Sequence, residues 1–298
     1  MLKEPQLFDP LVRDLEGNAH IVFPPGHPGH ADAAYQAHRD MVVAAALSHV
    51  PGTPPPDIVY TAQDHACWQH ISQALLPLQR QHAAREARQA LEDLALPTDH
   101  APQLADVSWR LAKLTGFTFA PAAGIVPLAE FYGSLADDTF HSTQFIRHHS
   151  RPLFSPEPDM VHEVLGHGAT LASPRFAALY RQVGAAARRA ETRESLKAVS
   201  RVFWFTLEYG LLEEAGELMV YGASLLSAYG ELSGFRDMEI RPLDVQQMVT
   251  QPYDVTSYQP VLFAARTLDE LEDFLGAFCS GVDGDTGSRL GVTADQKW

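Results

Sequence analysis

Two histidines and one glutamate are the residues of this sequence best suited to hold a reactive metal ion. His162 and His167 lie five residues apart in the segment SPEPDMVHEVLGH, and Glu208 is the sole carboxylate in the apolar segment VFWFTLEYGLL. A buried carboxylate is costly unless it is paired or coordinated. Two histidines and one carboxylate on one face of an octahedral ion leave positions open for oxygen and substrate. We therefore expect a mononuclear non-haem Fe(II) centre with these three ligands.

The spacing of the two histidines constrains the helix that carries them. Residues four apart lie about 40° apart around an α-helix, whereas residues five apart lie about 140° apart. We expect the helix that begins at Met160 to end between the histidines, with Gly166 in a left-handed C-terminal turn. The spacing disfavours the HExxH arrangement of zinc proteases, although a zinc hydrolase built on His162, Glu163 and His167 stays an alternative.

A purely structural role is the competing interpretation of the same residues. A single histidine on an apolar face is more often a core residue with satisfied hydrogen bonds. Glu208 could likewise pair with Arg147 or Arg201 instead of a metal ion. On the local pattern alone, both interpretations stay open.

The elements that must position these residues are predicted to be mostly helical. Apolar residues at three- and four-residue spacing predict helices over 31–48, 62–76, 82–94, 106–115, 160–165, 174–183, 194–212, 245–249 and 268–278. Residues 117–121 and 140–145 are expected to be extended, whereas 50–56 and 151–159 are broken by proline. No glycine-rich phosphate-binding motif occurs. We expect a single domain that is mostly α with a few short β-strands.

Composition and charge limit the classes of partner. Hydrophobic residues make up 46% of the 298 residues, so a sizeable core can be buried. The formal net charge is −15 and no cluster of Lys and Arg offsets it, which disfavours nucleic acid and anionic membranes. The sequence shows no membrane-spanning run and no secretory signal. With only Cys67 and Cys279 present, we expect a cytoplasmic protein without a disulfide framework.

Several further segments carry a family resemblance. They are HPG at 27–29, APQLADVSWRLAKLTGF at 101–117, TQFIRH at 143–148, SPEPDMVHEVLGH at 155–167, FWFTLEYGLL at 203–212, YGASLLSAYGEL at 221–232 and QPYDVTSYQP at 251–260. On these collinear segments the chain resembles the catalytic domain of the pterin-dependent aromatic amino acid hydroxylases, from near His27 to Phe278. The resemblance implies a basket-like domain, an Fe(II) ion, tetrahydrobiopterin or a related reduced pterin, and O2.

The resemblance also implies a substrate site. Arg147 matches the arginine that receives the substrate carboxylate, and Asp159 matches the residue that holds this arginine. A guanidinium suits this role because it can form two parallel hydrogen bonds to a carboxylate. Further residues matched to the surroundings of the substrate are Ser155, Pro158, Trp204, Tyr209, Ser224, Ser227 and Val255. Without the resemblance, an ordinary ion pair and ordinary core packing would be the preferred explanation of these residues.

A pterin site is implied in the same way. Phe131 matches the aromatic residue that stacks on the pterin, and Glu163 matches a glutamate that faces it, for which we expect a catalytic role. The other residues matched to the pterin site are Gly124, Ile125, Val126, His141 and Phe203.

Two positions predict phenylalanine as the substrate. Trp204 stands where the tryptophan enzymes of the family carry phenylalanine, which disfavours tryptophan. Val255 stands where the tyrosine enzymes carry an acidic residue, and an apolar side chain cannot hydrogen-bond to a substrate phenol.

Two departures from the family pattern concern the position of hydroxylation. Tyr209 follows Glu208 where phenylalanine is usual, and Ser224 replaces the usual glycine. Both add polar atoms near the expected substrate ring. We expect para hydroxylation to L-tyrosine, with meta-tyrosine as the first alternative and a tryptophan or tyrosine hydroxylase as the second. A catalytically silent binder would need a lost ligand, and no ligand is missing.

The domain boundaries are expected to follow the resemblance. We expect an irregular segment over 1–26, the iron- and pterin-dependent domain over 27–279, and a frayed tail over 280–298. We also expect no separate regulatory domain and no heptad-bearing tetramerisation helix, and therefore a monomer.

Overall fold

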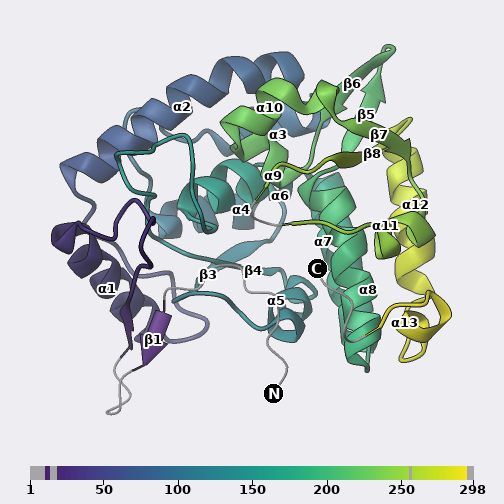
Figure 1. The fold of residues 1–298 in the computed structure, drawn as a ribbon, viewed down its shortest axis with the longest axis horizontal. Helices are drawn as coiled ribbons and strands as arrows, with labels where there is room; N and C mark the ends of the chain where they lie inside the picture. The colour runs from purple at the N-terminus through teal and green to yellow at the C-terminus, as the bar shows by residue number, and fades with distance from the viewer. Residues whose placement is uncertain (1–10, 14–18, 255–256, 294–298) are drawn as a thin grey trace.

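Helices make up most of the chain (Figure 1). The structure is a computed structural model that describes residues 11–13, 19–254 and 257–293. The longer helices are α1 (Ala33–Leu47), α2 (Ala62–His82), α3 (Arg85–Leu94), α4 (Leu104–Leu114), α5 (Leu128–Leu135), α7 (Pro174–Arg189), α8 (Arg193–Phe203) and α12 (Leu268–Ser280). The shorter ones are α6 (Ala169–Leu171), α9 (Ala223–Ser227), α10 (Tyr229–Gly234), α11 (Val245–Thr250) and α13 (Thr286–Arg289). Two π-helical segments, η1 (His162–Gly168) and η2 (Trp204–Glu208), and a 3₁₀ turn, η3 (Phe235–Asp237), complete the helical part.

Side-chain caps set where several helices begin. Thr61 and Asp64 form a reciprocal capping box at the start of α2, each side chain accepting a backbone N–H of the other residue. Ser173 caps α7, and Pro174 occupies its first turn, where a missing N–H has no cost.

Within the described part of the chain, the strands are short and form three small sheets. β5 (Leu211–Glu214), β6 (Glu217–Val220), β7 (Glu239–Pro242) and β8 (Val261–Ala265) make a four-stranded sheet in the order β6-β5-β8-β7. The β5–β6 pair is antiparallel, and the pairs that include β8 are parallel. β3 (Thr118–Pro121) and β4 (Thr139–Ser142) form a parallel pair. The expectation of a mostly helical domain with a few short strands is confirmed.

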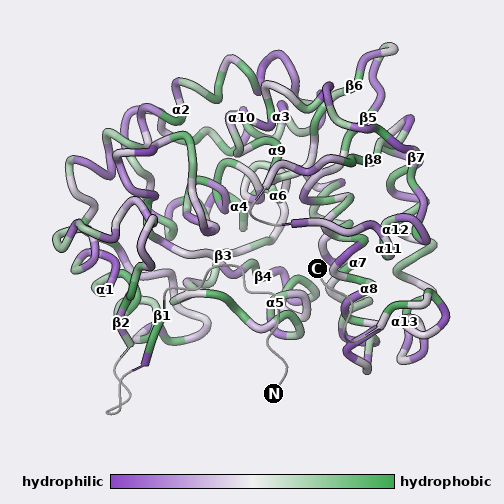
Figure 2. Tube along the Cα trace, viewed as in Figure 1, coloured by the Kyte–Doolittle hydropathy of each residue, from purple (hydrophilic) through white to green (hydrophobic). Residues whose placement is uncertain are grey.

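One large apolar cluster fills the interior between the helices. Its fully buried members include Trp68, Tyr180, Phe203 and Phe263. Figure 2 shows hydrophilic and hydrophobic residues alternating along α2, as expected for a helix with one buried face. A smaller cluster of Ile21, Phe23, Tyr35 and Val43 lies between α1 and the N-terminal strands. No helix among the described residues is long and apolar enough to cross a bilayer.

Several predicted boundaries are wrong for identifiable reasons. The helix predicted over 62–76 continues through Pro77 to His82. The helix predicted over 194–212 ends at Glu208, because Leu211 begins β5. The predicted irregular segment at the N-terminus includes the paired strands β1 (Leu11–Arg13) and β2 (Ala19–Ile21).

The predicted frayed tail is also partly ordered. α13 packs against α8, and Gly287 N–H donates to Ser195 Oγ at 2.9 Å. A Cβ on Gly287 would lie 2.4 Å from the Glu194 carbonyl carbon, so this contact requires glycine. Residues 294–298 lie outside the described residues.

Candidate active site

Three side chains from two helical segments converge in the interior. η1 carries both histidines, and η2 ends at the glutamate. His167 Nε2 lies 3.0 Å from Glu208 Oε1, and His162 Nε2 lies 3.9 Å from Glu208 Oε2. The two imidazole rings are nearly perpendicular, with centroids 4.8 Å apart. The structure therefore brings together the three ligands predicted from the sequence.

The π-helical geometry of η1 accounts for the five-residue spacing. A π-helix closes each turn with an i→i+5 hydrogen bond, so residues five apart lie one turn apart. The expectation that the helix ends at Gly166 in a left-handed turn is wrong, because η1 runs on into α6 and Gly166 has no positive φ. Glycine is needed here for another reason. A Cβ at Gly166 would lie 2.5 Å from the carbonyl oxygen of Ala223, at the start of α9.

Hydroxyl groups bind the other nitrogen of each histidine. His167 Nδ1 lies 2.8 Å from the Tyr180 hydroxyl, which lies 2.9 Å from Thr170 Oγ1, and Thr170 donates to His167 O at 3.0 Å. His162 Nδ1 lies 3.1 Å from Ser227 Oγ. The oxygens of these hydroxyls can accept a hydrogen bond from Nδ1–H, and in that tautomer each Nε2 carries a lone pair facing the carboxylate. That tautomer is the one a metal ion requires.

The surroundings shift the pKa of the two glutamates beside the histidines in opposite directions. Burial raises the pKa of Glu208, but His167, His162 and a hydrogen bond from Ser224 outweigh this and lower it to about 2. Burial, reinforced by neighbouring carboxylates, raises the pKa of Glu163 well above its usual range. Glu163 also lies close, since a carboxylate oxygen and the histidine nitrogens fall within 4.8 Å of one another. Glu208 is the candidate carboxylate ligand because its two oxygens lie 3.0 and 3.9 Å from the Nε2 atoms of His167 and His162, and two imidazoles with one carboxylate suit Fe(II).

A buried ion pair joins the predicted substrate arginine to η1. Arg147 donates from Nε to Asp159 Oδ2 at 2.8 Å and from Nη2 to Asp159 Oδ1 at 2.7 Å. Asp159 Oδ1 also accepts the backbone N–H of His162 at 3.2 Å. Ser155 and Pro158 lie in the same loop, where Ser155 Oγ donates to a backbone carbonyl. The loop therefore fixes the arginine relative to the first metal ligand.

The HPG segment and α1 both support this loop through Glu157. Arg39 donates to both carboxylate oxygens of Glu157, at 2.6 and 3.2 Å, and His27 Nε2 lies 3.5 Å from Glu157 Oε1. All three side chains are buried.

Two tyrosine rings lie against Trp204, the first residue of η2. The Trp204 ring lies 4.8 Å from that of Tyr209 and 4.6 Å from that of Tyr253, measured between centroids. Trp204 Nε1 donates to Gln259 Oε1 at 3.4 Å. Val255, the other residue predicted to report on the substrate, lies outside the described residues.

Comparison with known proteins identifies the family. A family model described as biopterin-dependent aromatic amino acid hydroxylase matches residues 18–287. The chain belongs to the biopterin-dependent aromatic amino acid hydroxylases. This membership goes against the zinc-hydrolase alternative, and it confirms the resemblance on which the enzyme class was predicted.

Individual relatives agree in class and differ in substrate. The phenylalanine 3-hydroxylase of Streptomyces coeruleorubidus is 45% identical over 264 residues, which cover 89% of this chain and 95% of that enzyme. The tyrosine 3-monooxygenase of Bos taurus is 38% identical over 283 residues, which cover 91% of this chain but only 57% of that enzyme.

Solved structures share the fold. The apo phenylalanine hydroxylase of Colwellia psychrerythraea 34H is 28% identical, with a TM-score of 0.72 over 82% of this chain and 92% of that one. The Chromobacterium violaceum phenylalanine hydroxylase with bound oxidised Fe(III) has a TM-score of 0.77 over 87% of this chain and 94% of that one. At 24% identity, the second likeness shows the fold alone.

Aromatic residues matched to the pterin site of this hydroxylase lie next to one ligand. The Phe131 ring, in α5, lies 5.3 Å from that of Phe140 and 6.4 Å from that of Phe203. Phe203 is parallel to the His167 imidazole within 18°, at 6.2 Å. Ring contacts thus lead from the predicted stacking residue Phe131 to the candidate ligand His167.

The remaining pterin positions flank α5. Gly124, Ile125 and Val126 lie in the loop that precedes α5, and Ile125 is 42% exposed. His141, in β4, has Nδ1 3.2 Å from Ser134 Oγ at the end of α5, and burial lowers its pKa. These residues matched to the pterin site are more exposed to solvent than the candidate ligands His167 and Glu208.

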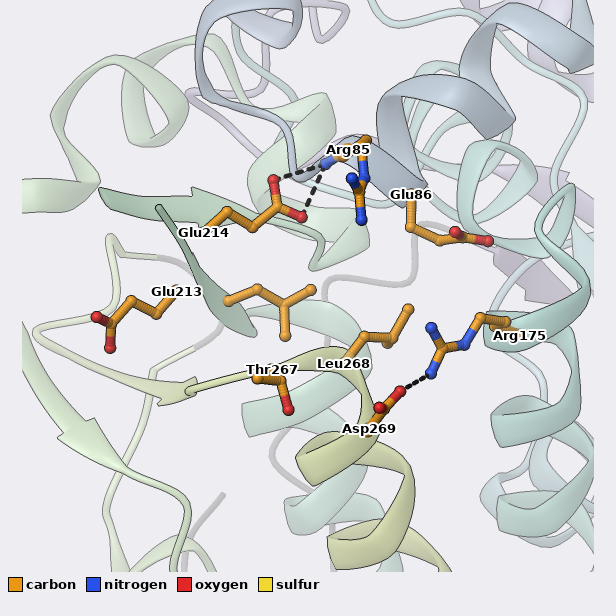
Figure 3. Close-up of a pocket in the computed structure, with 9 residues that line it drawn as sticks. Arg85, Glu86, Arg175, Glu213, Glu214, Thr267, Leu268 and Asp269 are labelled. Atoms are coloured by element: carbon orange, nitrogen blue, oxygen red, sulfur yellow. Dashed lines mark hydrogen bonds and ion pairs between the residues drawn. The ribbon is translucent and has the colours of Figure 1, made fainter. Parts of the chain in front are cut away.

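A pocket of about 300 Å³ lies apart from the candidate ligands and from the residues matched to the substrate and the pterin (Figure 3). It is lined by Arg85, Glu86, Arg175, Leu212, Glu213, Glu214, Thr267, Leu268 and Asp269. Charged groups of the pocket form ion pairs. Arg175, for example, pairs with Asp269 and, at 2.6 Å, with Glu272. It contains none of the predicted site residues.

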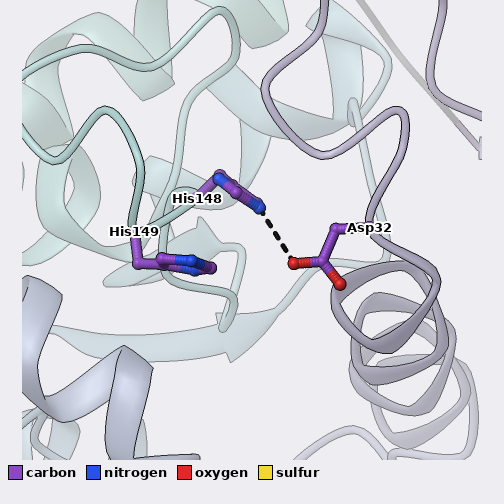
Figure 4. Close-up of side chains that lie close together, drawn as sticks. All are labelled: Asp32, His148 and His149. Carbon is purple, nitrogen blue, oxygen red and sulfur yellow. Dashed lines mark hydrogen bonds and ion pairs between the residues drawn. The ribbon is translucent and has the colours of Figure 1, made fainter.

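A second group of metal-binding side chains lies at the start of α1 (Figure 4). Asp32 caps α1 through Oδ1, and its Oδ2 lies 3.2 Å from His148 Nε2. His148 Nδ1 lies 2.8 Å from Ser150 Oγ, and the His149 ring stacks on that of His148. Helix capping and these hydrogen bonds account for the group.

Sequence reasoning missed three residues of the site. Tyr180 and Thr170 orient His167, and Glu231 connects to Tyr209. The available signal was weak: Tyr180 lies on the apolar face of a predicted helix, where a phenol needs a hydrogen-bonding partner that the sequence does not identify.

Proposed function

We propose that this hydroxylase converts L-phenylalanine into meta-tyrosine, with Fe(II) held by His162, His167 and Glu208. The observation that carries the choice of product is the 45% identity to a phenylalanine 3-hydroxylase over 95% of that enzyme's length. This relative favours meta hydroxylation over the para hydroxylation expected from the sequence.

The chain's own residues would bind and orient the reactants. Arg147 receives the carboxylate of the amino acid, while Asp159 holds the guanidinium. Trp204 provides an aromatic wall for the substrate ring, and Phe131 provides a stacking surface for the pterin. Bound Fe(II) and the reduced pterin together supply the activation of O2. Glu163, whose pKa is raised by burial, is suited to donate a hydrogen bond towards the pterin side.

Para hydroxylation is the second candidate. The phenylalanine hydroxylase of Colwellia psychrerythraea, at 28% identity, supports phenylalanine as the substrate without naming the position of attack. Trp204, which matches the phenylalanine and tyrosine enzymes of the family, favours the same substrate.

Product chromatography tests the proposal directly. Fe(II)-loaded enzyme is incubated with phenylalanine, a reduced tetrahydropterin and O2, and the products are resolved against para-, meta- and ortho-tyrosine. We expect meta-tyrosine, dependent on pterin and lost in His167→Ala. A para-tyrosine product would overturn the position of attack, and product only from tryptophan or tyrosine would overturn the substrate.

A further inference from the structure

A buried row of polar side chains leads from the candidate ligand Glu208 to α10. Ser224, in α9, donates from Oγ to Glu208 Oε2 at 2.6 Å. Ser224 and the Glu231 carboxyl both act on the pKa of the buried Tyr209 hydroxyl, which places this hydroxyl beside the two groups. Glu231 Oε1 accepts the backbone N–H of Gln259 at 3.1 Å. All four side chains from Glu208 to Glu231 are buried, so water does not compete for these bonds.

The two departures from the family pattern therefore meet in space. Phenylalanine in place of Tyr209 and glycine in place of Ser224 would supply neither hydroxyl. This sequence carries together the Ser224 hydroxyl that binds Glu208 and the Tyr209 hydroxyl beside it.

Tyr209 is held at both ends. Its ring packs on Trp204 with centroids 4.8 Å apart, and Ser224 and Glu231 act on the pKa of its hydroxyl at the other end. A phenol fixed in this way is a rigid partner for Ser224, since neither its ring nor its hydroxyl can move independently.

The orientation of a metal-binding carboxylate depends on such partners. The terminal torsion of a glutamate is broad, so an unsupported carboxylate can rotate and present one or both oxygens. Ser224 binds Oε2, whereas Oε1 lies 3.0 Å from His167 Nε2. Groups that hydrogen-bond to ligands in this way typically change metal affinity by about 10- to 100-fold.

We propose that Ser224 and Tyr209 are positioning residues that hold the Glu208 carboxylate in one orientation at the metal, with Glu231 anchoring the far end. The proposal rests on the metal centre of the proposed function. Ser224 acts directly on the carboxylate, and Tyr209 acts through Ser224.

Co(II) provides a readout that is independent of turnover, because its visible absorption reports coordination number and geometry. The apo full-length protein is titrated with Co(II) as wild type, Ser224→Ala, Tyr209→Phe and the double variant. Tyr229→Phe and Ser233→Ala are matched controls, since Tyr229 is 37% exposed on α10 and Ser233 bonds only within its own helix turn. Glu208→Ala tests the centre itself.

We expect Ser224→Ala to change the Co(II) spectrum and weaken Co(II) binding at least about tenfold. Tyr209→Phe should change the Co(II) spectrum and the Co(II) affinity in the same direction as Ser224→Ala, but by a smaller amount. In the Ser224→Ala background it should have no further effect. Both controls should match wild type.

A wild-type spectrum and affinity in Ser224→Ala would overturn the proposal, as would additive effects of the two substitutions. Tyr209→Phe keeps the ring that packs on Trp204, so it tests the row of polar side chains even if Ser224→Ala unfolds. Unchanged Co(II) binding in Glu208→Ala would instead overturn the proposed metal centre.

Discussion

Hydroxyl groups orient both candidate histidine ligands. The contacts among His167, Tyr180 and Thr170 form a closed path that returns to the His167 carbonyl. Such a path fixes both the tautomer and the ring orientation, which raises the basicity of the coordinating nitrogen.

Tyr180→Phe should weaken Co(II) or Fe(II) binding by about tenfold or more, because His167 Nδ1 loses its partner. Equilibrium titration of the apo protein measures this loss. Tyr60→Phe is the control, since Tyr60 is also a buried tyrosine whose hydroxyl donates to a backbone carbonyl, Gln144 O at 2.9 Å. Equal losses in the two variants would show a general effect of removing a buried hydroxyl.

Arg147→Lys should raise the KM for phenylalanine at least about tenfold, because an ammonium cannot bind Asp159 and a substrate carboxylate through a planar fork. The KM for the pterin should stay unchanged. Phenethylamine, which lacks the carboxylate, provides the chemical control: its turnover should respond little to the substitution. An equal effect on both substrates would argue that Arg147 has only a structural role.

At the scale of elements, two π-helical segments bring the ligands together, and α9 packs closely against both. Gly166 lies against Ala223, and a Cβ at Gly222 would lie 2.4 Å from Glu208 O. Neither Gly166 nor Gly222 can be replaced by a residue with a Cβ without a clash, because the neighbouring atoms belong to the backbone.

Gly166→Ala should therefore weaken metal binding and lower the unfolding temperature. Gly276→Ala is the matched control, since Gly276 lies inside α12 and a Cβ there would meet only Gln182 Oε1 at 3.7 Å. Where a Cβ has room, replacing glycine by alanine in the middle of a helix raises the free energy of unfolding by about 0.5–1 kcal/mol. Calorimetry with Co(II) titration measures both effects, and an unchanged Gly166→Ala protein would contradict the packing argument.

The sequence predicts the main helices well, because amphipathic periodicity is a local property. It predicts neither π-helix, since one wider turn leaves the apolar pattern nearly unchanged. His162 and His167 were predicted as ligands from their spacing, and Glu208 because a single carboxylate in an apolar segment is costly unless it is paired or coordinated. Tyr180 and Glu231 were not, because tertiary packing alone decides which polar group a buried side chain meets.

At the scale of the whole molecule, the candidate centre joins separate parts of the fold. η1 continues through α6 towards α7, whereas η2 extends α8 and leads into the four-stranded sheet through β5 (Figure 1). An ion bound by both segments would connect these parts in the folded state only. Metal binding and global unfolding should therefore be coupled.

Addition of Co(II) at a free concentration one hundred times its Kd should raise the free energy of unfolding by about 2.7 kcal/mol, and a chelator should reverse the gain. Urea unfolding with and without Co(II) measures the difference. His167→Ala should show no gain, because it removes a ligand from the centre. His149→Ala should retain the full gain, since its side chain belongs to the separate group beside Asp32. If His149→Ala abolished the gain and His167→Ala kept it, the stabilising ion would bind at α1, and the centre between η1 and η2 would lose its support.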